Sequence, residues 1–153
     1  MAQAQEPVKI RPLAAKDRAE WAALWRDYLA FYGTSVPAEV YDTTFERMLS
    51  DDPHEFSGLV AVAQGKLVGL VHYLFHRHGW KIENTCYLQD LYTAQDQRGL
   101  GIGSKLISAV YDAADAAGAP SVYWLTQSNN RQARRLYDQI GVQTDFIRYN
   151  RPA

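Results

Sequence analysis

Apolar side chains recur every three or four positions along residues 17–32, which is the spacing of one face of an α-helix. The stripe consists of Trp21, Leu24, Trp25, Tyr28, Leu29 and Tyr32. Gly33 follows at a position where helices commonly end. A second helix is predicted over residues 35–50, where an Asp-Asp-Pro sequence closes it.

Several shorter apolar stretches have the composition of β-strands. They are residues 8–13, 59–64, 67–76 and 85–93. Gly65 supplies a tight turn between the second and third of them, which predicts a hairpin. The segment before residue 85 is polar and contains glycine, so we expect a loop there.

Helical spacing returns over residues 103–117, and Gly118 stands where a terminating glycine belongs. Three further elements are predicted: a strand over 122–126, a helix over 130–140 and a strand over 145–149. The predicted order is β-α-α-β-β-β-α-β-α-β, without repeats or a linker. The sequence therefore predicts one mixed-sheet α/β domain over residues 1–153, with an ordered core at about residues 8–149.

Length and charge fit this single domain and exclude some function classes. The chain has 153 residues, a size that buries a sizeable core. Its 16 basic and 17 acidic side chains give a formal net charge of -1. Because nucleic-acid-binding domains are usually clearly basic, we expect no nucleic-acid partner.

Cysteine content and hydropathy indicate a cytoplasmic location. Cys86 is the single cysteine, so no intrachain disulfide can form. The longest mostly apolar run, residues 67–75, is far shorter than the roughly 20 residues of a membrane span, so no membrane association is expected. The first ten residues lack the charged and apolar regions of a signal peptide, and none is expected.

The strongest candidate for chemistry is a glycine-rich turn at residues 97–106, QRGLGIGSKL. Glycines at 99, 101 and 103 leave backbone N–H groups free to face an anion, and the following helix adds its positive N-terminal end. The spacing fits neither the phosphate loop of nucleoside triphosphatases nor the G-x-G-x-x-G dinucleotide fingerprint. The residues indicate a phosphate or pyrophosphate site, with a ligand-free turn as the alternative.

Residues 98–103 resemble the R-x-x-G-x-G acetyl-CoA motif of the GNAT superfamily of N-acetyltransferases. YLQDLYT, at residues 87–93, is similar to the fourth strand of that family and ends five residues before the arginine. Downstream, Asn130 precedes Tyr137 by seven residues, as the paired asparagine and tyrosine of the family do. The element order also matches over nearly the whole chain. The branch that it resembles most contains small-amine, polyamine and histone-type acetyltransferases.

The resemblance implies acetyl-CoA as cosubstrate and assigns residues to it. Leu91, Tyr92 and Thr93 would lie along the thioester and pantetheine arm, with Asn130 on that arm. The pyrophosphate would be held by Arg98, Gly99, Gly101, Gly103 and Ser104. Tyr137 would protonate the departing thiolate; the alternative is a core aromatic side chain on the last helix.

Acetyl transfer also requires a neutral amine, and the base that provides it is harder to assign. Gln89 stands where the polyamine branch has glutamate, and an amide is no useful base. Asp90 is the preferred candidate, although an ideal strand points it to the opposite face and a bulge would be needed to re-aim it. Glu83, a water chain, or selection of the neutral amine without a base are the alternatives.

Three histidines alternate along one strand and its extension, at positions 72, 76 and 78. No carboxylate or cysteine accompanies them at ligand spacing, so no metal site is expected.

Residues 37–55 are rich in acidic side chains, and Arg47 is the single positively charged residue among them. They form either a solvated helix face or an entrance that attracts a cation. We therefore expect an N-acetyltransferase for a small cationic amine, which is a diamine, polyamine or basic amino acid, or for a protein lysine. The alternatives are a non-catalytic acyl-CoA-binding regulatory or scaffold domain and a nucleotide-binding module. The resemblance also implies a homodimer.

Overall fold

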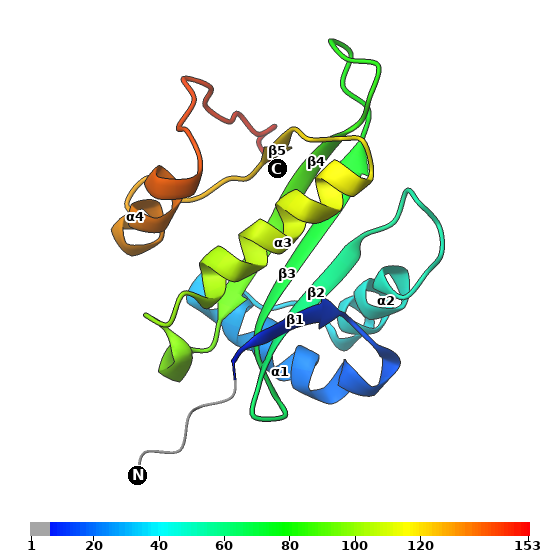
Figure 1. Cartoon of the computed structure of the whole chain (residues 1–153), viewed down its shortest axis with the longest axis vertical. Helices are drawn as coiled ribbons and strands as arrows, with labels where there is room; N and C mark the ends of the chain where they lie inside the picture. Colours follow the sequence, from blue (N-terminus) through cyan, green and yellow to red (C-terminus); the bar gives the residue numbers. More distant parts are fainter. Residues whose placement is uncertain (1–6) are drawn as a thin grey trace.

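The computed structural model describes residues 7–153, which form a five-stranded sheet with helices on both faces (Figure 1). The elements are β1 (Lys9–Pro12), α1 (Arg18–Phe31), α2 (Ala38–Met48), β2 (Ser57–Ala63), β3 (Lys66–His76), β4 (Thr85–Thr93), α3 (Ile102–Ala116), β5 (Val122–Tyr123) and α4 (Arg131–Ile140), with short 3-10 turns at Ala15–Asp17 and Gln95–Gln97. The predicted mixed-sheet α/β domain is confirmed.

The strands lie in chain order from β1 to β5. Neighbours from β1 to β4 are antiparallel, whereas β5 runs parallel to β4. That last pairing is short: it joins Cys86 to Val122 and Tyr87 to Tyr123. Within residues 7–153, the rest of β4 therefore has no strand beside it on the β5 side.

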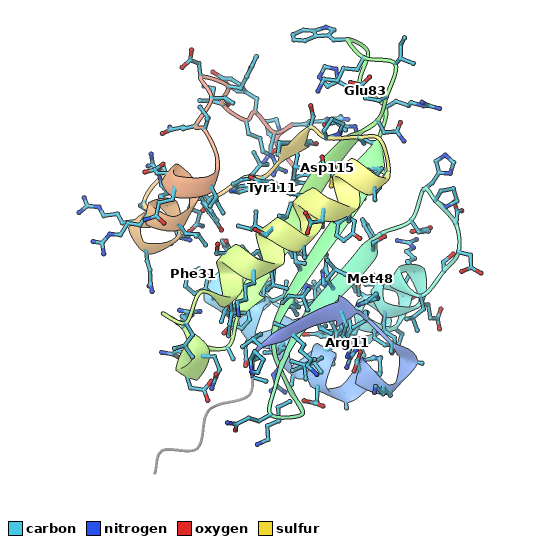
Figure 2. All side chains as sticks on the ribbon, in the orientation of Figure 1. Arg11, Phe31, Met48, Glu83, Tyr111 and Asp115 are labelled. Carbon is cyan, nitrogen blue, oxygen red and sulfur yellow. The ribbon has the colours of Figure 1, made fainter. Side chains whose placement is uncertain are left out.

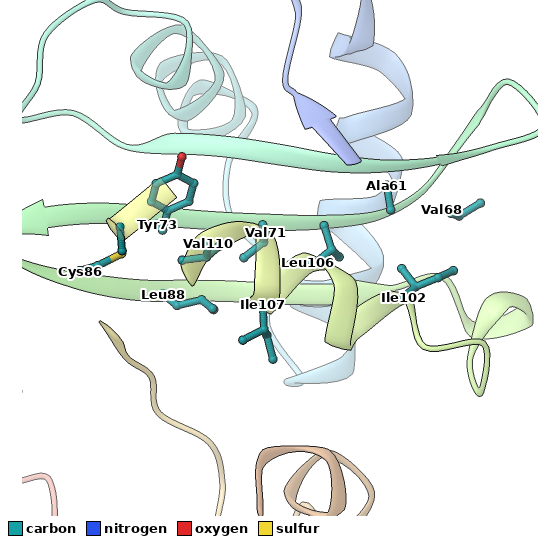
Figure 3. Close-up of a cluster of buried hydrophobic side chains, with 11 residues drawn as sticks. Ala61, Val68, Val71, Tyr73, Cys86, Leu88, Ile102, Leu106, Ile107 and Val110 are labelled. Carbon is teal, nitrogen blue, oxygen red and sulfur yellow. The ribbon is translucent and has the colours of Figure 1, made fainter. Parts of the chain in front are cut away.

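Each face of the sheet carries its own core. On one face, Ile102, Leu106 and Val110 of α3 pack against Val71 and Leu88, and Figure 3 shows this cluster. On the other face, α1 and α2 bury Trp21, Trp25, Phe45 and Met48 against Val60 and Leu70. The alternation of strand side chains between two apolar faces is what requires helices on both sides.

The approach of α3 to the sheet depends on Gly69 in β3. A Cβ atom there would lie 3.1 Å from Ile102 and from Leu106, and 3.2 Å from the Tyr92 carbonyl oxygen. The missing side chain thus lets α3 lie close over β3 and β4.

The start of α1 is fixed to β1 by a partly buried ion pair. Asp17 lies 2.7–2.8 Å from the guanidinium of Arg11 and also accepts the Ala14 N–H. Because the Arg11 guanidinium binds its charged form, the pKa of Asp17 is lowered.

The sequence-based prediction of a last strand over 145–149 is wrong, and β5 is shorter than predicted. Residues 143–153 are neither helix nor strand. Phe146, Ile147 and Tyr149 are 82%, 77% and 87% exposed. A strand requires a partner for its backbone groups, and within residues 7–153 none pairs with this segment.

No helix in residues 7–153 is long and apolar enough to cross a membrane. The expectation about a signal peptide rests on the first ten residues, of which residues 1–6 lie outside the described part of the chain.

Candidate active site

A cavity of about 370 Å³ opens where the C-terminal end of α1, the end of β4, the start of α3 and the exposed helix α4 meet. Its lining consists of Tyr28, Phe31, Tyr32, Leu91, Tyr92, Thr93, Gln97, Arg98, Gly99, Gly101, Ile102, Gly103, Ser104, Asn130, Gln132, Ala133, Leu136 and Tyr137. All nine residues that the sequence assigns to acetyl-CoA are among them, and so is Tyr137. A more open hollow of about 550 Å³ between β1 and α3 shares only Ser104 with this set.

The glycine-rich turn presents bare backbone to the cavity. Gly99 and Gly101 have φ angles of +81° and +76°, a region that favours glycine, and no atom lies within 4 Å of a Cβ built on either. Gly101 is the N-cap of α3, and its carbonyl accepts the Lys105 N–H. The amides of the first turn of α3 have no acceptor within the helix. Open space and unpaired N–H groups together fit a pyrophosphate.

Gly103 sets the distance between α3 and α4. A Cβ atom at this position would lie 3.2 Å from Leu136 of α4. The third glycine of the motif therefore serves a close helix contact, which holds α4 and Tyr137 against the cavity.

Arg98 contacts both the end of β4 and the end of α1 in the cavity wall. Its Nε donates to the Thr93 carbonyl oxygen at 3.3 Å. The guanidinium also lies 5.7 Å from the ring centre of Phe31 and 5.5 Å from that of Tyr92. These cation–π contacts hold the positive charge beside the glycine turn. Figure 2 shows Phe31 at this end of the sheet.

Asn130 begins α4 as well as lining the cavity. Its side-chain oxygen accepts the Ala133 N–H at 3.4 Å, which is an N-cap interaction. Helix α4 therefore starts at a residue of the cavity lining.

Tyr137 is a half-buried residue of α4. Its ring packs edge-on against Trp124, with 5.5 Å between ring centres. Burial, with a smaller contribution from the nearby Tyr32, raises the pKa of Tyr137 to about 12. The phenol therefore keeps its proton at neutral pH, as a proton donor must. Tyr137 is a lining residue of the cavity, and its ring also packs against the core.

A bulge at Gln89 re-aims Asp90. In the β3–β4 pairing His72 faces Asp90 while the next residue, Tyr73, faces Leu88, so Gln89 is the extra residue. Leu88 consequently stays in the core under α3, whereas Asp90 turns to the face that carries α1. Gln89 itself is exposed.

Asp90 is not part of the cavity lining. One carboxylate oxygen accepts the Tyr28 hydroxyl at 2.8 Å, and the other lies 2.8 Å from Nδ1 of His72. Tyr28 stands between Asp90 and the cavity. The Tyr28 hydroxyl therefore links the carboxylate to the cavity wall.

The other candidate base and the acidic stretch lie away from the cavity. Glu83 is an exposed residue of the β3–β4 loop, at the end of the sheet opposite to Phe31 in Figure 2. The strand residues from Thr85 to Leu91 separate it from the cavity, a span of about 20 Å. No residue of α2 or of the loop after it lines the cavity; Asp42 pairs with Arg18, and Glu55 lies 4.0 Å from Arg47.

Sequence reasoning missed three aromatic lining residues, Tyr28, Phe31 and Tyr32. Tyr28 and Tyr32 belong to the apolar stripe of the first helix, and the stripe alone indicates only core packing. The available signal was their position at the C-terminal end of the stripe, where tyrosine replaces the leucine and tryptophan of the first turns.

The histidine series does not form a cluster. His72 is buried beside Trp21, whereas His76 lies 2.7 Å from the Tyr123 hydroxyl and His78 accepts the Trp80 N–H. Among residues 7–153 no group of three or more histidine, cysteine, aspartate or glutamate side chains could hold a metal ion.

Comparison with known proteins identifies the family. The model of the acetyltransferase (GNAT) family matches residues 21–142. The D-amino-acid N-acetyltransferase HPA3 of Saccharomyces cerevisiae is 36% identical over 145 residues, which are 94% of this chain and 90% of that protein. The thialysine N-epsilon-acetyltransferase of Bos taurus is 36% identical over 77 residues, which are 50% of this chain and 45% of that protein.

Among solved structures, the aminoglycoside N-acetyltransferase AAC(6')-Iy in complex with CoA has the same fold. Its TM-score is 0.84 at 17% identity, over 99% of this chain and 98% of that one. The family match, the identity to HPA3 and the glycine-rich cavity lead to one conclusion. The chain belongs to the acetyltransferase (GNAT) family and is an N-acetyltransferase that uses acetyl-CoA as its cosubstrate.

Proposed function

We propose that this enzyme acetylates the primary amine of a small cationic acceptor, with basic amino acids and diamines first and protein lysine as the second class. The observation that carries the proposal is the cavity itself. It joins the glycine turn, the end of β4 and Tyr137 to a wall of aromatic side chains from α1. Such a wall suits a small organic amine better than an extended polypeptide.

In this proposal the turn and the first amides of α3 hold the pyrophosphate, with Arg98 beside them. Backbone N–H groups of residues 91–93 polarise the thioester carbonyl, and Asn130 faces the pantetheine arm. Tyr137 donates its proton to the departing sulfur. Asp90 receives the proton that the amine loses.

The charge around the acceptor wall supports a cationic amine. Asp90 carries a negative charge directly behind Tyr28, and the faces of aromatic rings attract cations. The relatives act in the same chemical range, because HPA3 is named for D-amino acids and the bovine protein for thialysine. Both names describe amines on amino acids. The acidic segment after residue 37 could add only long-range attraction, since none of it lines the cavity.

An amine screen tests the proposal. Release of free thiol from acetyl-CoA is followed with putrescine, spermidine, the D and L forms of lysine and phenylalanine, and a lysine-containing peptide. We expect the fastest release with a cationic free amino acid or diamine, and a kcat/KM that falls with ionic strength. Cys86 will not disturb the assay, because burial raises its pKa to about 11. Preference for the peptide, or for a neutral acceptor with a flat salt response, would refute the proposed substrate class.

We also propose that two chains pair through their C-terminal segments, and that the enzyme works in the cytoplasm. Val142, Phe146, Ile147 and Tyr149 are exposed apolar residues in one short stretch. Among residues 7–153, β5 is the last strand of the sheet, so that its outer side is open. Light scattering should give twice the chain mass of 17.3 kDa, and Phe146→Asp with Ile147→Asp should return the monomer mass. A monomer for the unchanged protein at micromolar concentration would refute the pairing.

A further inference from the structure

A chain of three buried hydrogen bonds runs from the core to the cavity wall. The Trp21 Nε1–H group lies 2.9 Å from Nε2 of His72, Nδ1 of His72 lies 2.8 Å from Asp90, and the Tyr28 hydroxyl lies 2.8 Å from the other Asp90 oxygen. Trp21, His72 and Asp90 are 0%, 3% and 7% exposed. Tyr28 is the member that lines the cavity.

The donors in this chain determine where the protons lie. An indole nitrogen can only donate, so Nε2 of His72 must accept and carries no proton. The proton of the neutral imidazole is therefore on Nδ1, from which it is donated to Asp90. Asp90 is consequently a carboxylate that accepts one hydrogen bond from His72 and one from Tyr28.

This carboxylate is buried with neutral donors only. Within residues 7–153 no lysine or arginine forms an ion pair with Asp90. The titratable side chains that face it are His72 from β3, Tyr28 from α1 and Tyr32, the C-cap residue of α1. The arrangement thus holds an uncompensated charge one hydroxyl group away from the cavity.

Tyr28 has the properties of a proton carrier between the two. Burial raises the pKa of Tyr28, and the negative charge of Asp90 raises it further, so the hydroxyl stays protonated and points its hydrogen at Asp90. Its oxygen retains lone pairs that can accept a hydrogen bond from a bound amine.

We propose that Tyr28 is the catalytic residue that takes the proton from the acceptor amine, while Asp90, held by His72 and Trp21, receives the proton that Tyr28 gives up. This inference rests on the proposed function. Before attack, one proton of the ammonium moves to the Tyr28 oxygen while the Tyr28 proton moves to Asp90, which leaves a neutral amine with a free electron pair. As the nitrogen–carbon bond forms and the carbon–sulfur bond breaks, the nitrogen loses its second proton to water and the Tyr137 proton moves to sulfur. Asp90 then returns its proton to solvent and Tyr137 regains one, so each cycle that starts from the ammonium releases one proton.

The competing explanation is that the hydrogen bonds only fasten α1 to β3 and β4. The two explanations differ in their pH dependence. Without the relay the enzyme must select the neutral amine, whose fraction rises tenfold per pH unit below the pKa of the amine. Loss of the relay should therefore reduce activity most near neutral pH and least at alkaline pH. Loss of a fastening contact should reduce activity by the same factor throughout.

The experiment compares Tyr28→Phe and Asp90→Asn with the unchanged enzyme, using D-lysine, spermidine and putrescine as acceptors between pH 6.5 and 9.5. Tyr28→Phe keeps the ring that packs against Tyr32 and Tyr92. Tyr41→Phe, which removes a hydroxyl from an aromatic side chain packed on Trp25 outside the cavity, is the matched control.

At pH 7 we expect both variants to lose about 100-fold in kcat. The loss in kcat/KM should shrink about tenfold per pH unit as the pH rises, with an unchanged KM for acetyl-CoA. Combining the two substitutions should cost no more than either alone, because they interrupt one path. Tyr41→Phe should match the unchanged enzyme at every pH.

Two results would overturn the relay: a full rate in Tyr28→Phe at pH 7, or a loss of the same factor at every pH. Either would leave the proposed function intact, provided that the unchanged enzyme turns over the amine. Absence of thiol release by the unchanged enzyme with every amine would instead refute the proposed function and the relay with it.

Discussion

The imidazole of His72 and the carboxylate of Asp90 lie 2.8 Å apart because a bulge at Gln89 turns Asp90 onto the face of the sheet that carries His72. Without the extra residue, Asp90 would point towards α3, into an apolar core. One inserted position thus decides which side of the sheet receives a charge.

The proton positions in this pair can be observed directly. We expect ¹⁵N NMR of His72 to show a protonated Nδ1 and a bare Nε2. Trp21→Phe leaves that buried Nε2 without its donor, which should reduce the free energy of unfolding by about 1–3 kcal/mol. A protonated Nε2 in the unchanged protein would contradict the assigned tautomer.

A carboxylate at Gly101 should abolish CoA binding and leave the fold in place. A side chain at this position meets open space, so Gly101→Glu costs only the strain of its positive φ, about 1–2 kcal/mol. Its charge would stand where a phosphate must approach the α3 amides. The measurement is calorimetric titration with CoA. Gly118→Glu, also at positive φ with open space but at the far end of α3, should lose similar stability and bind CoA normally.

Removal of the Tyr137 hydroxyl should lower kcat about 100-fold with little change in the KM for acetyl-CoA. The ring keeps its packing on Trp124, so only proton donation to sulfur is lost. Because the pKa of Tyr137 is about 12, this phenol stays protonated up to about pH 11. Below that pH, the pH–rate profile of Tyr137→Phe should therefore have the same shape as that of the unchanged enzyme. An unchanged kcat in steady-state assays would make Tyr137 a core aromatic only.

The end of α4 depends on the absence of a side chain at Gly141. A Cβ atom there would lie 2.8 Å from the Trp124 ring, which is closer than real contacts allow. Gly141→Ala should therefore displace α4 or Trp124 and reduce the free energy of unfolding by about 1–3 kcal/mol, with a lower kcat through the displaced Tyr137. Denaturant titration gives the stability. Gly79→Ala, which meets no atom within 4 Å, should leave both quantities unchanged; equal effects of the two substitutions would contradict the contact.

Local spacing in the sequence predicted the helices, the hairpin and the glycine turn, because each depends on residues close together in the chain. The shared location of Asn130, Tyr137 and the glycine turn was implied by the resemblance to the GNAT family, and all three line one cavity. The position of Tyr28 before Asp90 could not be predicted, since it depends on the β3–β4 register and on how α1 lies across the sheet.

The predicted strand over residues 145–149 fails for a related reason. Alternation of apolar residues indicates that a segment is able to form a strand. Actual pairing also requires a neighbouring strand within hydrogen-bonding distance. Among the described residues, β5 ends at Tyr123 and no strand takes up its open side. The segment therefore shows strand composition without strand structure.

The early end of the β4–β5 pairing has a consequence for the exchange of amide hydrogens with solvent. From Leu88 to Thr93 every second amide points to the side on which residues 7–153 supply no strand. These amides should exchange quickly in the free enzyme, although they belong to a strand in the interior of the sheet. Bound CoA at 100 times its dissociation constant stabilises the folded state by about 2.7 kcal/mol. Slower exchange on CoA binding should be concentrated at this edge, so that the cosubstrate serves as the missing neighbour of β4.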